Sequence, residues 1–352
     1  MIPMTLFAES FDWNNLTQQA VNGLTIGSLF ALIALGYTMV YGIVELINFA
    51  HGDLFMLGAF LAWTILSWFG LDKSEALKAA STFTLLAPLV LAFLVVPVFC
   101  AALNYSVDRT VYKPLRNAPK LAPLVSAIGV SFVFMGVGLF WGGPQDVNFP
   151  DVIGALERKA VGEEPPTSAA DKTGSDDAKK EKPKSRNLLG PNSKVELTVK
   201  HVLILGVTIP LMIALTWFVK LTNLGKAMRA TAQNPTAAKL MGINTDKVIG
   251  ATFAIGGMLA GFGSIVYGLT INTISYQMGF QNGLYAFTAA VLGGIGNIPG
   301  AVLGGLVIGL VRSLGSAYVG ETWTSALVFV VLIVILVFRP SGLLGARIRE
   351  KV

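Results

Sequence analysis

Four polar residues at one junction between apolar segments are candidates for chemistry within a membrane: Glu45, Asn48, His51 and Asp53, in "YGIVELINFAHGDLF". Ionisable groups are costly in lipid and are usually functional there. In a continuous helix Glu45, Asn48 and His51 would share one flank, because they are three residues apart. Two interpretations stay open. The four residues form an inner gate or line a transport path, or Asn48 caps the second apolar helix and the charged groups sit in the wet interface.

Arg312 is a further ionisable residue inside an apolar segment, 300–319. Its long side chain either snorkels outward, faces a carboxylate, or faces a pore. The residues alone do not choose among these three interpretations.

The sequence lacks the residue combinations that enzymatic catalysis needs. With two histidines, the single Cys100 and no HExxH motif, metal catalysis has no ligand set. "KLTNLGKAM" offers a Gly-Lys pair, but Lys220 replaces the first glycine of a phosphate loop, and Ala227 stands where Ser or Thr is needed. "GGIGNIPG" follows no predicted strand and is expected to be a turn. The sequence therefore predicts neither an enzyme nor a cofactor-binding chain.

The composition indicates a protein that has lipid as its solvent. Hydrophobic residues make up 53% and charged residues 13% of the 352 residues, against about 25% charged in soluble domains. Each helix that crosses a bilayer needs roughly 20 apolar residues. Nine segments are candidates: 16–40, 48–70, 82–104, 121–142, 199–219, 248–270, 278–294, 300–319 and 324–338. We expect a single all-α polytopic membrane domain over 1–352, with about nine, between eight and ten, transmembrane helices.

The basic residues indicate the orientation. The segments 105–120, 220–247 and the tail from Arg339 hold thirteen basic and three acidic residues, so all three should be cytoplasmic. The N-terminus, with Glu9 and Asp12 and no base, should lie outside. An outer N-terminus and an inner C-terminus require an odd number of crossings. The crossing 278–294 is the weakest, because a re-entrant half-helix is tolerated where protein covers it.

Two loops stand out between these segments. The loop 143–198 should be extracytoplasmic, and its stretch 161–187 has no aromatic residue and only one large aliphatic, which predicts disorder. The loop 220–247 contains a predicted short helix: Asn234 is a good N-cap, Pro235 suits the first turn, and Gly242 can end the helix in a left-handed conformation. Its apolar residues Ala237, Leu240 and Met241 share one face.

Small residues spaced by four indicate close helix packing. The pairs are Gly23/Gly27 with Ala31, Gly138/Gly142, Gly257/Gly261, Gly300/Gly304 and Gly305/Gly309.

Three long blocks carry a resemblance to a known family. They are "GYTMVYGIVELINFAHGDLFMLGAF", "GKAMRATAQNPTAAKLMGINTDKVIGATFAIGGMLAG" and "AFTAAVLGGIGNIPGAVLGGLVIG". The chain resembles the permease subunit of ABC importers for branched-chain amino acids, in order and over nearly its whole length except 143–198. The resemblance implies the fold of cobalamin-type (type II) importer permeases, in the inner or plasma membrane. It also implies four kinds of partner: a second homologous permease, two cytoplasmic ATPases that bind ATP and Mg, an extracytoplasmic solute-binding protein, and membrane lipid, but no nucleic acid.

In this family the cytoplasmic loop carries a helix that couples the permease to the ATPases. The resemblance therefore assigns the following residues to the coupling loop: Gly225, Arg229, Asn234, Pro235, Ala237, Ala238, Leu240, Met241 and Gly242. Without the resemblance, an interfacial helix lying on anionic lipid fits the same residues. The insert 152–195 departs from the family, and Arg312 stands where an acidic or neutral residue is expected.

The family expectation for the substrate is leucine, isoleucine and valine. Close relatives transport urea and short amides, which stay open as alternatives. An ion-coupled secondary transporter is less consistent with the sequence, because such proteins carry coupling carboxylates at the midplane. Here Glu45 and Asp53 lie near the inner end, and no other acid lies deep in a span.

Overall fold

The computed structural model describes residues 13–73, 77, 80–116, 118–119, 121–161, 187–188 and 195–345. The predicted disorder falls almost entirely outside these residues. Glu9 and Asp12, and the basic residues of the tail beyond 345, also lie outside them.

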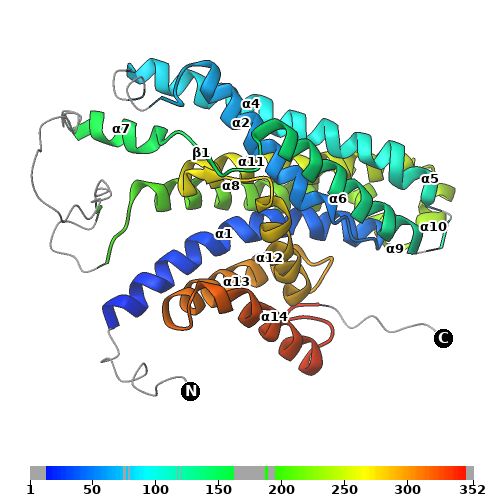
Figure 1. The fold of residues 1–352 in the computed structure, drawn as a ribbon. Helices are drawn as coiled ribbons and strands as arrows, with labels where there is room; N and C mark the ends of the chain where they lie inside the picture. Colours follow the sequence, from blue (N-terminus) through cyan, green and yellow to red (C-terminus); the bar gives the residue numbers. More distant parts are fainter. Residues whose placement is uncertain are drawn as a thin grey trace, which may run out of the picture.

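The fold is all-α, as predicted, and its long helices run roughly side by side (Figure 1). In chain order the elements are α1 (Trp13–Val44), α2 (Ala50–Trp68), α4 (Thr82–Val107), the π-helical turn η2 (Asp108–Tyr112), α5 (Lys113–Leu115), α6 (Leu121–Gly142), β1 (Val147–Asn148), α7 (Val152–Val161), α8 (Val199–Leu221), α9 (Asn223–Gln233), α10 (Pro235–Leu240), α11 (Thr245–Ile271), β2 (Thr273–Ile274), α12 (Met278–Gly293), α13 (Ile298–Tyr318) and α14 (Glu321–Phe338). Strands β1 and β2 pair antiparallel, with Val147 opposite Ile274.

Eight helices of the described chain are long and apolar enough to cross a membrane. They are α1, α2, α4 with its extension to Leu115, α6, α8, α11, α13 and α14. These eight coincide with eight of the nine predicted segments, so the polytopic membrane fold is confirmed. The ninth, α12, has 16 residues, which span about 24 Å of a hydrocarbon core about 30 Å thick. It packs against α1, α2 and α13.

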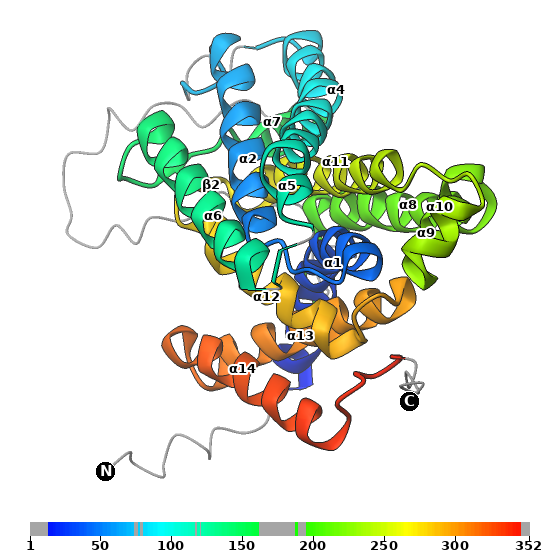
Figure 2. The ribbon, with the colours of Figure 1, turned by 90° about the vertical axis from the view of Figure 1, so that its right-hand side faces the viewer.

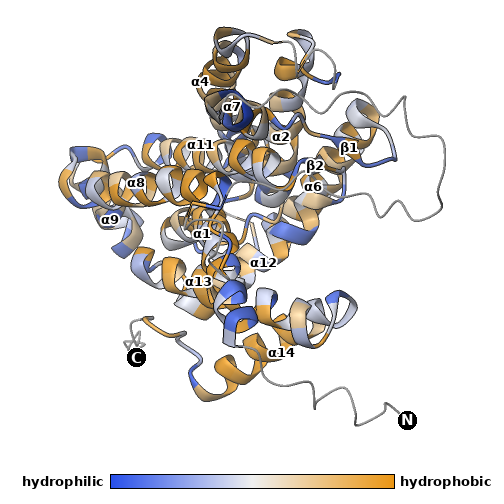
Figure 3. Cartoon of the chain, turned by 90° about the vertical axis from the view of Figure 1, so that its left-hand side faces the viewer, coloured by the Kyte–Doolittle hydropathy of each residue, from blue (hydrophilic) through white to orange (hydrophobic). Residues whose placement is uncertain are grey.

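The helices differ in burial: central helices are covered by protein, and peripheral helices are exposed where lipid would surround them. Helices α1, α2 and α11 are mostly buried, whereas α6, α8 and α14 are mostly exposed. The exposed side chains of the peripheral helices are large and apolar, such as Phe140, Trp217 and Phe338. In Figure 3, α8 and α14 are correspondingly hydrophobic over most of their length. Exposed apolar area on this scale needs lipid to cover it.

Glycine contacts hold α1 against α13. A Cβ atom on Gly305 would lie 2.5 Å from Cα of Ala31, and one on Gly27 would lie 2.9 Å from the Gly305 carbonyl oxygen. Such distances leave no room for a side chain, so the two backbones are in direct contact. The other predicted glycine pairs also pack closely. Gly257 and Gly261 of α11 contact α4, and Gly300 and Gly304 of α13 contact α12. Gly138 and Gly142 of α6 contact side chains of α2.

The short polar elements gather at the two ends of the bundle. Helices α5, α9 and α10 lie at one end, and α7 lies at the other (Figure 1). Figure 2 looks onto the end that carries α5, α9 and α10. Helix α11 begins beside α10 and runs for 27 residues, which places its last turn roughly 40 Å away. The protein thus has two distant ends at which a site can form.

Candidate functional site

The predicted short helix of the loop 220–247 is present as α10. The Asn234 side chain accepts a hydrogen bond from the backbone N–H of Ala237 at 2.9 Å, and Pro235 occupies the first turn. Gly242 ends the helix with φ of 82°, a conformation that favours glycine. The predicted cap, start and end are therefore all confirmed.

Helix α10 leaves an apolar patch uncovered. Leu240 is 84% and Met241 is 83% exposed, and Ala237 is exposed beside them. We call these three residues the α10 patch. Ala238 points the other way and is buried. Two large apolar side chains exposed this fully at a polar end of the bundle indicate a surface that another molecule covers.

Helix α9, which precedes α10, was not predicted. Its N-cap is Thr222, whose hydroxyl accepts from the Gly225 N–H at 3.0 Å. Gly225 is buried against the last turn of α8, where a Cβ atom would lie 2.6 Å from the Phe218 carbonyl oxygen. The Arg229 guanidinium donates to the carbonyl oxygens of Val219 and Lys220. Gly225 and Arg229 thus fasten α9 to α8 and are not part of the α10 patch.

An ion cluster joins η2 and α5 to the first turn of α11. Arg116 donates to Asp108 and to Asp246, both at 2.6 Å, and Lys113 lies 3.0 Å from Asp246. The Asp108 side chain is fully buried, whereas that of Asp246 is 41% exposed. Since α11 follows α10 after four residues, the cluster ties the α10 region to α4. Sequence reasoning treated these basic residues only as orientation signals.

Asn48 does not cap α2. The N-cap position is Phe49, which makes no side-chain cap bond. The Asn48 side-chain oxygen Oδ1 instead accepts from the Tyr112 hydroxyl at 2.9 Å, and the side-chain Nδ2 donates to Asn104 Oδ1 at 3.2 Å. Asn104 in turn donates to the Phe253 carbonyl oxygen at 2.6 Å. The cap interpretation was wrong because the Asn48 side chain bonds instead to buried partners on η2 and α4.

The other three residues of the predicted cluster do not meet at one site. His51 and Asp53 are buried within the bundle, at 1% and 0% exposure, so the wet-interface interpretation was wrong for these two residues. The Ser131 hydroxyl donates to Asp53, and the His51 ring lies edge-on to Tyr37 with centroids 4.8 Å apart. Glu45 is exposed, and its φ of 55° marks the break between α1 and α2.

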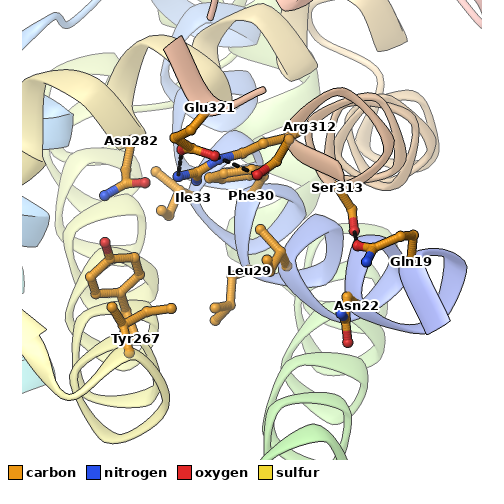
Figure 4. Close-up of a pocket in the computed structure, with 13 residues that line it drawn as sticks. Gln19, Asn22, Leu29, Phe30, Ile33, Tyr267, Asn282, Arg312, Ser313 and Glu321 are labelled. Atoms are coloured by element: carbon orange, nitrogen blue, oxygen red, sulfur yellow. Dashed lines mark hydrogen bonds and ion pairs between the residues drawn. The ribbon is translucent and has the colours of Figure 1, made fainter. Parts of the chain in front are cut away.

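A cavity of about 290 Å³ is lined by residues near the start of α1 and the end of α11, which is the end of the bundle opposite α10. Helices α1, α11, α12, α13 and the start of α14 surround it, with Phe30 and Ile33 of α1 in its wall (Figure 4). Arg312 faces this cavity and a carboxylate: its guanidinium is 3.7 Å from Glu321 and lies over the rings of Phe30 and Tyr285. Sequence reasoning did not predict the cavity, because its lining comes from five separate helices.

A second, much smaller cavity lies further along α1, toward the α10 end, and aromatic side chains line it. Tyr37 and Tyr41 continue the α1 face of Phe30 and Ile33, and they line this second cavity of only about 10 Å³. Ring centroids of Phe287 lie 6.1 Å from Tyr37 and 5.7 Å from Phe49. We call Tyr37, Phe49 and Phe287 the aromatic plug. These rings lie further along the bundle toward the α10 end than the residues of the larger cavity.

Eight helices able to cross a membrane, with an open cavity at one end of the bundle, define a polytopic membrane protein and are consistent with a permease. Comparison with known proteins agrees: the chain belongs to the family described as branched-chain amino acid transport system, permease component, whose model matches residues 19–337. It is accordingly a multi-pass protein of the inner membrane and a transport component, not itself an enzyme.

Three relatives illustrate the range of similarity. The chain is 37% identical to the high-affinity branched-chain amino acid transport system permease protein LivH of Salmonella typhimurium over 338 residues, 95% of this chain and 97% of that protein. It is 38% identical to the corresponding protein BraD of Pseudomonas aeruginosa over 340 residues, with the same two shares. The autoinducer 2 import system permease protein LsrC of Photorhabdus laumondii is 30% identical over 135 residues, 36% of this chain and 40% of that protein. No solved structure matches.

The ion cluster gives a prediction about stability. Arg116→Ala would leave the buried Asp108 carboxylate without its cation, which costs about 3–5 kcal/mol. Lys113→Ala removes only a partly exposed partner of Asp246 and should cost about 0–1 kcal/mol. Thermal unfolding in detergent should therefore show a large loss for Arg116→Ala and a small one for Lys113→Ala, with Asp108→Asn partly rescuing the former. Equal losses for the two single variants would contradict this account of the cluster.

Proposed function

We propose that this chain is the channel-forming permease subunit of an ABC importer for leucine, isoleucine and valine. It would pair with a second, homologous permease. Two cytoplasmic ATPases would supply the energy, and an extracytoplasmic binding protein would deliver the solute. The relatives named as branched-chain amino acid permeases support the substrate class. The exposed α10 patch is the observation that carries the role of the chain in such an assembly.

The proposed orientation places α10 in the cytoplasm. The loop that carries α10 holds four exposed basic residues: Lys226, Arg229, Lys239 and Lys247. An excess of lysine and arginine in short loops is typical of the cytoplasmic side. The cavity beside Arg312 then faces the exterior, and the fold would be that of cobalamin-type importer permeases.

We propose that α10 docks into a groove of an ATPase through the α10 patch. The apolar side chains would be buried there and the exposed basic residues of the loop would meet acidic residues. Asn234, Pro235 and Gly242 fix the ends of the helix, so it moves as one rigid piece. ATP and Mg bind to the ATPases and not to this chain.

Transport would then follow by alternating access. ATP-driven closure of the ATPases displaces α10 and with it the start of α11. The ion cluster passes this displacement to η2 and α4, and the Tyr112–Asn48–Asn104 hydrogen bonds pass it to the junction of α1 and α2. The free energy that shifts the two states comes from ATP, because only a ligand with different affinity for the two states shifts them.

The aromatic plug is the proposed gate of this path. His51 packs against Tyr37, and the Ser131 hydroxyl on α6 donates to Asp53. Both residues would therefore support the gate from within the bundle and would not line the path. Glu45, exposed at the break between α1 and α2, would serve as part of the hinge.

The docking proposal predicts the effect of a charge in the α10 patch. Leu240→Asp would bury a carboxylate in the apolar contact, so the ATPases should dissociate in detergent pull-downs, and ATP-driven leucine uptake by the reconstituted complex should be lost. Asn223→Asp adds the same charge to an exposed position of α9 and should leave both intact. Retained ATPase binding and normal uptake by Leu240→Asp would refute the docking role. A wild-type complex that takes up no leucine would refute the proposed function.

The gate proposal predicts a leak. Tyr37→Ala removes a ring of the plug, so leucine preloaded into proteoliposomes should escape severalfold faster without ATP. Tyr318→Ala removes a half-exposed ring at the end of α13 and serves as the control. A leak equal to that of the control would show that the plug does not close the path.

A further inference from the structure

We propose that the cavity beside Arg312 receives a free amino acid through its α-carboxylate and α-ammonium groups. Arg312 binds the carboxylate, Glu321 binds the ammonium, and the apolar side chain lies against Ile26, Leu29 and Ile33. This inference rests on the proposed function and deepens it, because it assigns substrate contacts within this chain.

Aromatic rings hold the Arg312 guanidinium in place. It lies 4.9 Å from the Tyr285 centroid and 5.6 Å from that of Phe30, and both rings are buried. Cations over such ring faces are attracted by the ring quadrupole. The Tyr285 hydroxyl is itself fixed by a 2.6 Å hydrogen bond with Ser325. The cation is therefore positioned before any ligand arrives.

The donors of Arg312 remain available to a ligand. A guanidinium has five N–H donors in a planar fork that matches a carboxylate. Among the described residues, Arg312 makes no hydrogen bond to protein, and its ion pair with Glu321 is long, at 3.7 Å. Its side chain is 25% exposed, toward the cavity. A ligand carboxylate can thus bind Arg312 without breaking a tight internal contact.

Glu321 supplies the opposite charge at the rim. Its side chain is 68% exposed, and one of its oxygens accepts from the Ser316 hydroxyl at 2.6 Å. The two charges of the site therefore cancel and complement those of a zwitterion. Figure 4 shows both side chains at the same side of the cavity, with Leu29 and Ile33 beyond them.

The size and polarity of the cavity fit a small amino acid. Its volume of about 290 Å³ lies at the lower end of the range of about 300–1,000 Å³ for ligand pockets. Isoleucine and leucine residues wall one part, and the amide of Asn282 and the Tyr267 ring lie across from them. Urea and short amides carry neither a carboxylate nor an ammonium group, so they would leave Arg312 and Glu321 with only their long ion pair to each other. The site therefore favours an amino acid over these alternatives.

The position of the cavity fits a site of first contact. It lies at the end of the bundle opposite α10, where a binding protein would dock in the proposed orientation. The α1 face that lines it leads directly to the aromatic plug. A solute released by the binding protein would be held here until the plug opens.

The test measures leucine uptake and ATP hydrolysis together, in proteoliposomes that hold the full transporter with its leucine-loaded binding protein. Arg312→Gln should lower uptake about tenfold, as expected for loss of a charge-assisted hydrogen bond. The ATP hydrolysis stimulated by the binding protein should stay within about twofold of wild type, because α10 lies roughly 40 Å away. Lys159→Gln removes one exposed positive charge from α7 at the same end and should change neither quantity.

Two further variants test the site independently of Arg312→Gln. Arg312→Lys keeps the charge but not the planar fork, so its uptake should fall between those of Arg312→Gln and wild type. If Arg312→Gln fails to assemble, the exposed Glu321→Gln provides the test and should also lower uptake. If Arg312→Gln takes up leucine at the wild-type rate, the inference is overturned and the proposed function still stands. The same holds for Glu321→Gln if Arg312→Gln fails to assemble. Absence of leucine uptake by the wild type would instead overturn the proposed function.

Discussion

Several contacts between the central helices depend on one constraint: a polar group inside a lipid-surrounded bundle is costly unless it finds a partner within the protein. This requirement explains the contacts of the central helices. Asp108 is buried and needs Arg116, Asn48 bridges Tyr112 and Asn104, and Asp53 accepts from Ser131. The contacts of Asn48 and Asp53 tie together helices that are distant in sequence, so polar satisfaction also connects them mechanically. The α10 patch is apolar and lies outside this network, at the polar end of the bundle. It is therefore the surface through which the proposed ATPases would act on the chain.

The path and the network share the same helices. Helix α1 packs its glycines on α13 and turns a second face, from Phe30 to Tyr41, toward the two cavities. The junction that follows α1 is held by Asn48 and backed by His51. A movement of the junction therefore acts directly on Tyr37 and the plug. Tyr37 and Phe49, two of the three rings of the proposed gate, thus lie on the same stretch of chain as this junction.

The features that were predictable from the sequence are local. Eight spans, the Asn234 cap, the Gly242 end and the close glycine pairs follow from composition or from spacing within one segment. The ion cluster and the cavity were missed because they join residues far apart in the chain; Arg116 and Asp246 are separated by 130 positions. The Asn48 cap was predicted wrongly because capping is a local rule, and buried partners from two other elements, η2 and α4, overrode it. Helix α9 had a local signal, the Thr222 cap, that was not used.

The central claim is that energy reaches this chain mechanically through α10. It is tested most directly by cross-linking from the α10 patch in the assembled transporter. Cys100 is buried and is the single cysteine of the chain, so Met241→Cys can be labelled with a photoreactive maleimide, and Trp217→Cys on the lipid-facing side of α8 serves as the control. We expect Met241→Cys to cross-link to an ATPase subunit, with a yield that changes when ATP binds, and Trp217→Cys to react with lipid alone. Cross-links from Met241→Cys to lipid only, or to a protein on the exterior, would contradict the account.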